Sequence, residues 1–144
     1  MRARIAIGSV VMMFLLAFPA NADGKGELQK HFNAVATKVK ATEDPSEKRA
    51  ILDESFQTML TALDMVQRSQ LISKEDGVAL DLFRATLREK QDELDGTNGF
   101  ARVPDEQLNN FSDYVVQSVE QADGTITISL VALVLIIILL VLLL

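Results

Sequence analysis

The chain has 144 residues and a formal net charge of −6, with 49% hydrophobic and 24% charged residues. This length suits one small domain and excludes a second catalytic domain, because compact domains typically have about 100 to 150 residues. The chain contains no cysteine and one histidine, which excludes disulfide frameworks, zinc–thiolate sites, iron–sulfur clusters and thiol nucleophiles. Much of the apolar content lies in two runs, one near each end of the chain. The sequence therefore indicates where the protein is located and its fold class more directly than its activity.

Residues 1–22 are typical of a secretory signal peptide. Two arginines precede an apolar run over residues 5–18, and Pro19, Ala20 and Ala22 close the segment. This order of basic, apolar and small residues predicts cleavage before Asp23. The alternative is an uncleaved anchor, since the apolar run is long enough to enter a bilayer.

The carboxyl-terminal run, Ile126 to Leu144, has 19 residues and no charge. As a helix it would measure roughly 28 Å, close to the ~30 Å hydrocarbon thickness of a bilayer. All its faces are apolar, whereas a surface helix of a soluble bundle has a polar face. We therefore predict a transmembrane anchor over residues 125–144 that contacts the lipid bilayer through Ile126 to Leu144. The alternative is a glycolipid-attachment signal, in which the small residues 122–124 precede a removable tail.

Residues 23–124 are predicted to form an extracytoplasmic helical domain. All 20 acidic residues of the chain fall within it, so its surface repels phosphate backbones and nucleic acid is not an expected partner. Its location is predicted to be the periplasm or the cell exterior, which makes the chain a single-pass membrane protein. No cofactor is expected.

Four amphipathic helices are predicted in this domain from apolar spacing. The first carries a stripe from Leu28 to Val39, and the second is capped by Asp44 with Pro45 at its first position. The third is capped by Ser73 and ends at Gly96, where glycine can take the left-handed conformation. The fourth carries an apolar stripe that closes at residues 123–124 and is made of Leu108, Phe111, Val115, Val119 and Ala122.

The predicted fold is all-α: a small up-down four-helix bundle followed by the carboxyl-terminal transmembrane helix. A three-helix core with a loosely docked first helix is the structural alternative. In an up-down bundle the fourth helix ends beside the start of the first helix and beside the link over residues 69–73. The longest irregular segment, residues 96–104, then lies at the opposite end, away from the membrane.

Two residue patterns were considered as metal sites, and neither fits a known set of ligands. His31 follows Glu27 by four residues, but a di-iron bundle needs a second histidine, so His31 is expected at the core boundary. Acidic residues around Gly99 superficially resemble a calcium loop, yet no register places both glycine and its ligands correctly. A helix cap followed by a turn explains them, so no metal ligand is predicted.

Phe100 and Arg102 are the predicted partner-binding residues. They lie on the exposed loop over residues 96–104, and aromatic and guanidinium side chains are the types that anchor protein contacts. The alternative is that Phe100 covers the end of the bundle and Arg102 pairs with Asp105.

Catalysis is not expected, because the chain has no nucleophile elbow, phosphate loop or dinucleotide fingerprint. The predicted function is a membrane-anchored, exported helical accessory or protein-interaction module. The alternative is a small-ligand-binding or sensing bundle, which would need a deep apolar pocket. Three surplus apolar residues are either scattered on the surface or form a second contact face, namely Met65, Leu82 and Val116.

Overall fold

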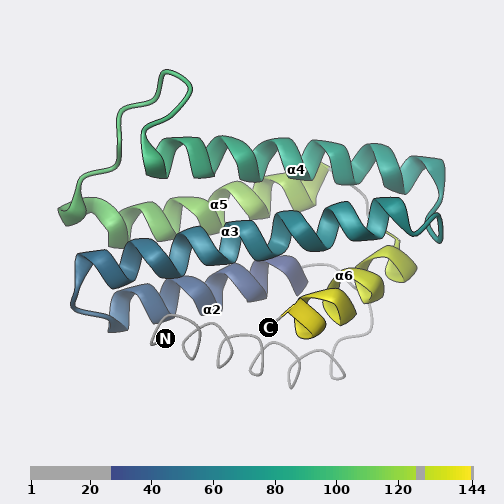
Figure 1. The fold of residues 1–144 in the computed structure, drawn as a ribbon, viewed down its shortest axis with the longest axis horizontal. Coiled ribbons are helices and arrows are strands. Elements are labelled where there is room, and N and C mark those ends of the chain that lie inside the picture. Colours follow the sequence, from purple (N-terminus) through teal and green to yellow (C-terminus); the bar gives the residue numbers. More distant parts are fainter. Residues whose placement is uncertain (1–26, 126–128, 144) are drawn as a thin grey trace.

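The computed structural model describes residues 27–125 and 129–143, and all regular elements in this part of the chain are helices. The predicted signal peptide, residues 1–22, lies outside the described residues, as do residues 126–128 of the predicted anchor. Four long helices lie side by side in Figure 1, and consecutive helices run in opposite directions. They are α2 (Glu27–Ala41), α3 (Pro45–Arg68), α4 (Lys74–Asp95) and α5 (Leu108–Thr125). The predicted helical bundle is confirmed.

The helix ends follow the predicted capping residues. Asp44 caps α3, since its carboxylate accepts a hydrogen bond from the Ser46 N–H at 2.9 Å, and Ser73 caps α4 by accepting from the Asp76 N–H at 3.1 Å. Gly96 ends α4 in the left-handed conformation, with φ of +74°. A short 3-10 helix, η2 (Asp105–Gln107), leads into α5. Each cap satisfies backbone groups that a helix end leaves without an intrahelical partner.

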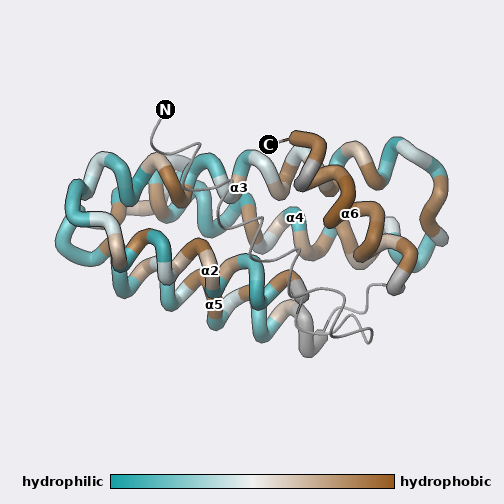
Figure 2. Tube along the Cα trace, turned by 90° about the horizontal axis from the view of Figure 1, so that it is seen from below, coloured by the Kyte–Doolittle hydropathy of each residue, from teal (hydrophilic) through white to brown (hydrophobic). Residues whose placement is uncertain are grey.

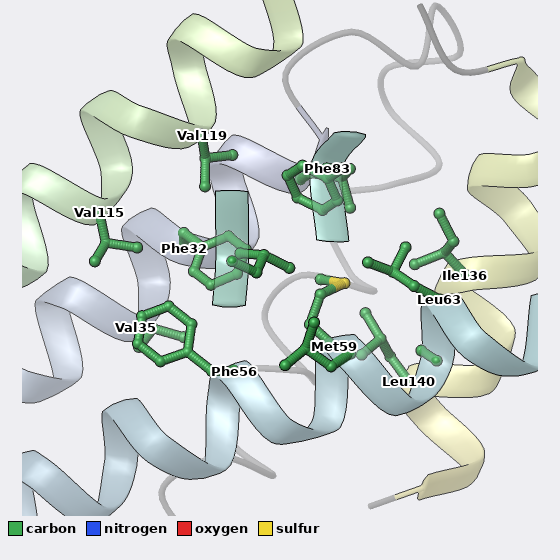
Figure 3. Close-up of a cluster of buried hydrophobic side chains, with 14 of the residues drawn as sticks. Phe32, Val35, Phe56, Met59, Leu63, Phe83, Val115, Val119, Ile136 and Leu140 are labelled. Atoms are coloured by element: carbon green, nitrogen blue, oxygen red, sulfur yellow. The ribbon is translucent and has the colours of Figure 1, made fainter. Parts of the chain in front are cut away.

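All four helices contribute to a single apolar core. Figure 3 shows Phe32 and Val35 of α2, Phe56 of α3, and Val115 and Val119 of α5 meeting at its centre. The expected stripe on α2 is buried along its length, so the first helix is an integral part of the bundle and not a loosely docked addition. The three-helix alternative is therefore wrong.

The arrangement of the bundle ends is as expected. The start of α2, the link between α3 and α4 and the end of α5 lie at one end in Figure 1. The loop over residues 96–104 lies at the other end, where the turn between α2 and α3 also lies. We call this segment the distal loop.

The carboxyl-terminal run forms a fifth helix in the described part, α6 (Leu130–Leu143), which packs obliquely against α3 (Figure 1). Figure 2 shows α6 as a continuous hydrophobic stretch, whereas the other helices alternate between polar and apolar residues. In the described part of the run the helix begins at Leu130, and Ser129 caps it by accepting a hydrogen bond from the Ala132 N–H at 3.2 Å. Among the described helices, none is both long and apolar enough to cross a membrane.

Candidate functional site

The distal loop folds back onto the end of α4 at Gly96. A Cβ atom built on Gly96 would lie 2.7 Å from the Arg102 Cβ atom and 2.8 Å from the Arg102 backbone nitrogen. Those distances are far shorter than van der Waals contact, and the positive φ disfavours other residues as well. Glycine at this position therefore allows the two ends of the loop to approach each other.

Asp92 orders the first half of the loop. Its carboxylate accepts hydrogen bonds from the Asn98 amide at 2.9 Å and from the Thr97 hydroxyl at 2.8 Å. These two hydrogen bonds, that from Asn98 first, lower the pKa of Asp92 from its ordinary value. The residues that superficially resemble a calcium loop thus form a helix end and a turn. In the described part of the chain, no group of three or more His, Cys, Asp or Glu side chains is placed to hold a metal ion.

Arg49 of α3 holds the second half of the loop. Its guanidinium donates to the Leu94 carbonyl oxygen at 2.9 Å, to the Val103 carbonyl oxygen at 2.7 Å and to the Asp105 carboxylate at 2.8 Å. The side chain is only 11% exposed. One cation therefore ties together the end of α4, the distal loop and η2, as the planar, multiply donating guanidinium group allows.

Phe100 and Arg102 remain at the surface of this ordered loop. Phe100 is 39% exposed, and its N–H donates to the Thr97 carbonyl oxygen at 3.1 Å. Arg102 is exposed and does not pair with Asp105, because Arg49 takes that carboxylate. The expected alternative pairing of Arg102 is therefore wrong. Arg49 was not predicted from the sequence, because its three acceptors lie 45 to 56 residues further along the chain.

A pair of carboxyl groups lies beneath the loop. The pKa of Asp53 is raised to about 6, first by burial and then by the negative charge of Asp95. The cations of Arg49 and Arg102 act in the opposite direction. The Asp53 carboxyl group therefore holds its proton to a higher pH than an ordinary aspartate does.

The start of α6 is held by a second polar contact, at the opposite end of the bundle. Asp76 of α4 accepts hydrogen bonds from the Ser129 N–H at 3.0 Å and from the Ser129 hydroxyl at 2.6 Å. We call this contact the Asp76–Ser129 clasp. Asp76 is buried, and burial alone would raise its pKa, but the hydrogen bonds from Ser129 and Ser73 outweigh burial and lower it.

The α6 helix is apolar on its inner and its outer faces. Its inner face is buried, and Figure 3 shows Ile136 and Leu140 beside Met59 and Leu63 of α3. Its outer face is exposed, to 59% at Val131, 48% at Ile138 and 74% at Leu142. Residues 130–143 contain only alanine, valine, leucine and isoleucine. The outer face therefore presents a stripe of apolar side chains with no polar residue among them.

His31 is fully within the core and not at its boundary. It is 2% exposed, and its ring meets Phe32 edge to face with the ring centroids 5.2 Å apart. Burial lowers the pKa of His31 to about 4, so the imidazole is neutral at pH 7. The Glu27 side chain, the other half of the metal pair weighed above, lies outside what the structure describes.

Two open grooves run between neighbouring helices. The groove between α3 and α4 has a volume of about 570 Å³ and is lined mostly by polar residues such as Gln57, Asp64 and Arg88. The groove between α4 and α5 has a volume of about 620 Å³, and Leu82 and Tyr114 line it. Of the surplus apolar residues, Met65 and Leu82 are exposed, whereas Val116 packs against the core.

Comparison with family models, curated proteins and solved structures gives no match to this chain.

Proposed function

We propose that this protein is an exported helical accessory protein, anchored to a membrane by its carboxyl-terminal helix, that binds a protein partner through the distal loop. The outer face of α6 is the observation that carries the membrane anchor. Val131, Ile138 and Leu142 expose large apolar side chains, and exposing apolar surface to water costs about 25 cal/mol per Å². A bilayer removes this cost without requiring any polar group on the helix.

The length of the uncharged run supports a membrane-spanning form of the anchor. The 19 residues from Ile126 to Leu144 would cover roughly 28 Å as a continuous helix, close to the hydrocarbon thickness of a bilayer. The signal-peptide pattern of residues 1–22 supports export of the domain. Together they favour a single-pass protein whose bundle stands in the periplasm or outside the cell.

The order and position of the distal loop support its role in partner binding. Arg49 and Asp92 hold the loop in one conformation, so little entropy is lost when a partner binds. Phe100 and Arg102 are exposed on it. The loop lies at the opposite end of the bundle from the start of α6 (Figure 1), so a partner could reach it without approaching the lipid.

Crosslinking in intact cells tests the partner-binding role. A crosslinked complex should form with the wild-type chain and disappear in the double variant Phe100→Ala, Arg102→Ala, because both anchors are removed. Leu71→Ala is the matched control, since Leu71 is exposed in the link at the other end of the bundle. The same complex in the folded double variant would contradict a role for the loop.

An alkaline phosphatase fusion after residue 125 tests export, because this enzyme becomes active only outside the cytosol. An active fusion supports the proposed location of the bundle. An inactive fusion that is expressed at the same level would contradict it.

The groove between α4 and α5 favours a second candidate function, the binding of a small amphipathic molecule. Leu82 offers an apolar wall, and Lys90 donates to the Tyr114 hydroxyl at 2.7 Å. Tyr114 is the only tyrosine of a chain without tryptophan, so its fluorescence reports directly on this groove. Saturable changes in Tyr114 emission during a screen of amphipathic acids, lost in Leu82→Asp, would favour this function over partner binding.

A further inference from the structure

The Asp76–Ser129 clasp joins two parts of the chain that are 53 residues apart. A buried carboxylate is unfavourable unless it is hydrogen-bonded, and both oxygens of Asp76 accept from Ser129, at 3.0 and 2.6 Å. Ser129 in turn accepts a hydrogen bond from the Ala132 N–H. It therefore connects Asp76 of α4 to the first turn of α6. A negative charge near the positive end of the α6 dipole adds to this contact. The clasp therefore fixes where α6 begins and keeps it beside the bundle.

The clasp also limits the length of the apolar helix. With Ser129 as its cap, α6 has 14 residues, or about 21 Å, which is shorter than the ~30 Å hydrocarbon core. The whole uncharged run has 19 residues and would reach roughly 28 Å if it formed one helix. A helix long enough to span the bilayer therefore requires Ser129 to leave its capping position.

Release of α6 changes the surroundings of two apolar surfaces, one on α6 and one on α3. On release, the inner face of α6, including Ile136 and Leu140, moves from the protein to lipid, and both surroundings are apolar. The principal cost is the exposure of α3, where Met59 and Leu63 lie beside α6 in Figure 3. The polar contacts of the clasp exist only in the docked state, so they add to this cost of release.

We propose that the Asp76–Ser129 clasp is a releasable lock: when closed it holds α6 on α3 with Leu142 and its neighbours in the bilayer surface, and when open it lets the helix lengthen and cross the bilayer. This inference rests on the proposed function, because it requires a membrane as the occupant of the outer face of α6. A bilayer is favoured as that occupant because no polar residue interrupts α6, whereas protein interfaces have a polar rim.

Spin labels on the full chain in phosphatidylcholine nanodiscs test membrane contact and docking separately. The chain has no cysteine, so Met65→Cys and Leu142→Cys provide two labelling sites, and both side chains are exposed on α3 and α6 respectively. Collisions of the Leu142→Cys label with oxygen and with a water-soluble nickel chelate report whether it lies in lipid or in water. The distance between the two labels reports whether α6 is docked.

With the clasp intact, the Leu142→Cys label should contact lipid and the pair should give mainly the short, docked distance. D76N and S129A should each raise the ratio of long to short distances at least tenfold, because S129A removes the hydroxyl that donates to Asp76 and D76N replaces the charged acceptor with a neutral amide. E75Q is the matched control: it removes a charge from the adjacent exposed residue, whereas Ser129 donates to Asp76. It should leave the ratio unchanged.

Two results would overturn the proposal, and they differ in what else they contradict. If the label at position 142 stays in water, both the membrane anchor and the lock are wrong. If that label lies in lipid but D76N and S129A give the same distances as E75Q, the anchor stands and the lock is wrong. Circular dichroism of each variant establishes that the bundle is folded. Equal distance ratios in D76N and S129A show that the effect comes from loss of the clasp and not from a defect of one variant.

Discussion

Replacing Arg49 with methionine should loosen the distal end of the bundle. Methionine keeps much of the aliphatic volume but loses all three hydrogen bonds, to Leu94, Val103 and Asp105. A hydrogen bond to a charged group contributes about 1.5–3 kcal/mol, and the three acceptors share one side chain, so their contributions are not additive. We expect the free energy of unfolding to fall by about 3 kcal/mol.

Urea unfolding of the full chain in mild detergent measures this loss, and hydrogen exchange measures its location. Amide exchange should accelerate across residues 96–104 and remain slow in the centre of α3, because only the loop loses its attachment. Lys48→Met is the matched control: Lys48 is the adjacent cation and makes one hydrogen bond, to Asn109 at 2.7 Å. A loss below about 0.5 kcal/mol, or unchanged exchange in the loop, would show that Arg49 does not hold the loop in place.

Three further predictions concern glycine and buried titratable groups. Gly96→Ala should destabilise by several kcal/mol because its Cβ would overlap Arg102, whereas Gly99→Ala, with positive φ but open space, should lose only about 1 kcal/mol in thermal unfolding. The raised pKa of Asp53, about 6, makes the native state bind its proton more tightly, so this carboxyl group adds stability as pH falls from 7 to 5. Asp53→Asn should remove that increment, about 1 kcal/mol with solvent screening, and identical pH profiles for the two proteins would contradict it. The effect of His31 on stability has the opposite dependence on pH. Because its pKa is lowered to about 4, the free energy of unfolding falls as pH drops below 6.5, by about 3 kcal/mol in all. His31→Phe should reduce this loss of stability at acid pH.

The bundle was predictable because its helices carry local signals at both ends. Asp44 and Ser73 are cap residues by type, and the structure places both at the starts of helices. Gly96 marks the end of α4, because glycine adopts the left-handed conformation more easily than other residues do. Apolar spacing then identified the buried faces, since a period near 3.6 points one stripe of each helix at the core.

The position of α6 was not predictable from such signals. A helix with a polar face shows which side must be buried, but residues 130–143 are apolar on every side, so their sequence gives no direction for packing. The Asp76–Ser129 clasp could not be predicted from the sequence either, because Asp76 has the position of an ordinary acidic residue in a first helical turn. Its partner, Ser129, lies far along the chain.

The candidate loop was located correctly, but the contacts that shape it were not. Phe100 and Arg102 are exposed as residue type and position indicated. The pairing of Asp105 depended on which of two arginines lies closer, and the fold brings Arg49 to it from 56 residues away. The burial of His31 depended likewise on how the rest of the bundle covers α2, and its position beside the apolar stripe indicated only the core boundary.

Membrane fractionation of cells that express the full chain tests the central claim, that the carboxyl-terminal helix attaches an exported bundle to lipid. The full-length chain should sediment with membranes and require detergent for release, whereas a chain ending at residue 125 should be recovered in the soluble extracytoplasmic fraction. Recovery of the intact full-length chain in the aqueous cytosolic fraction, without detergent, would contradict it.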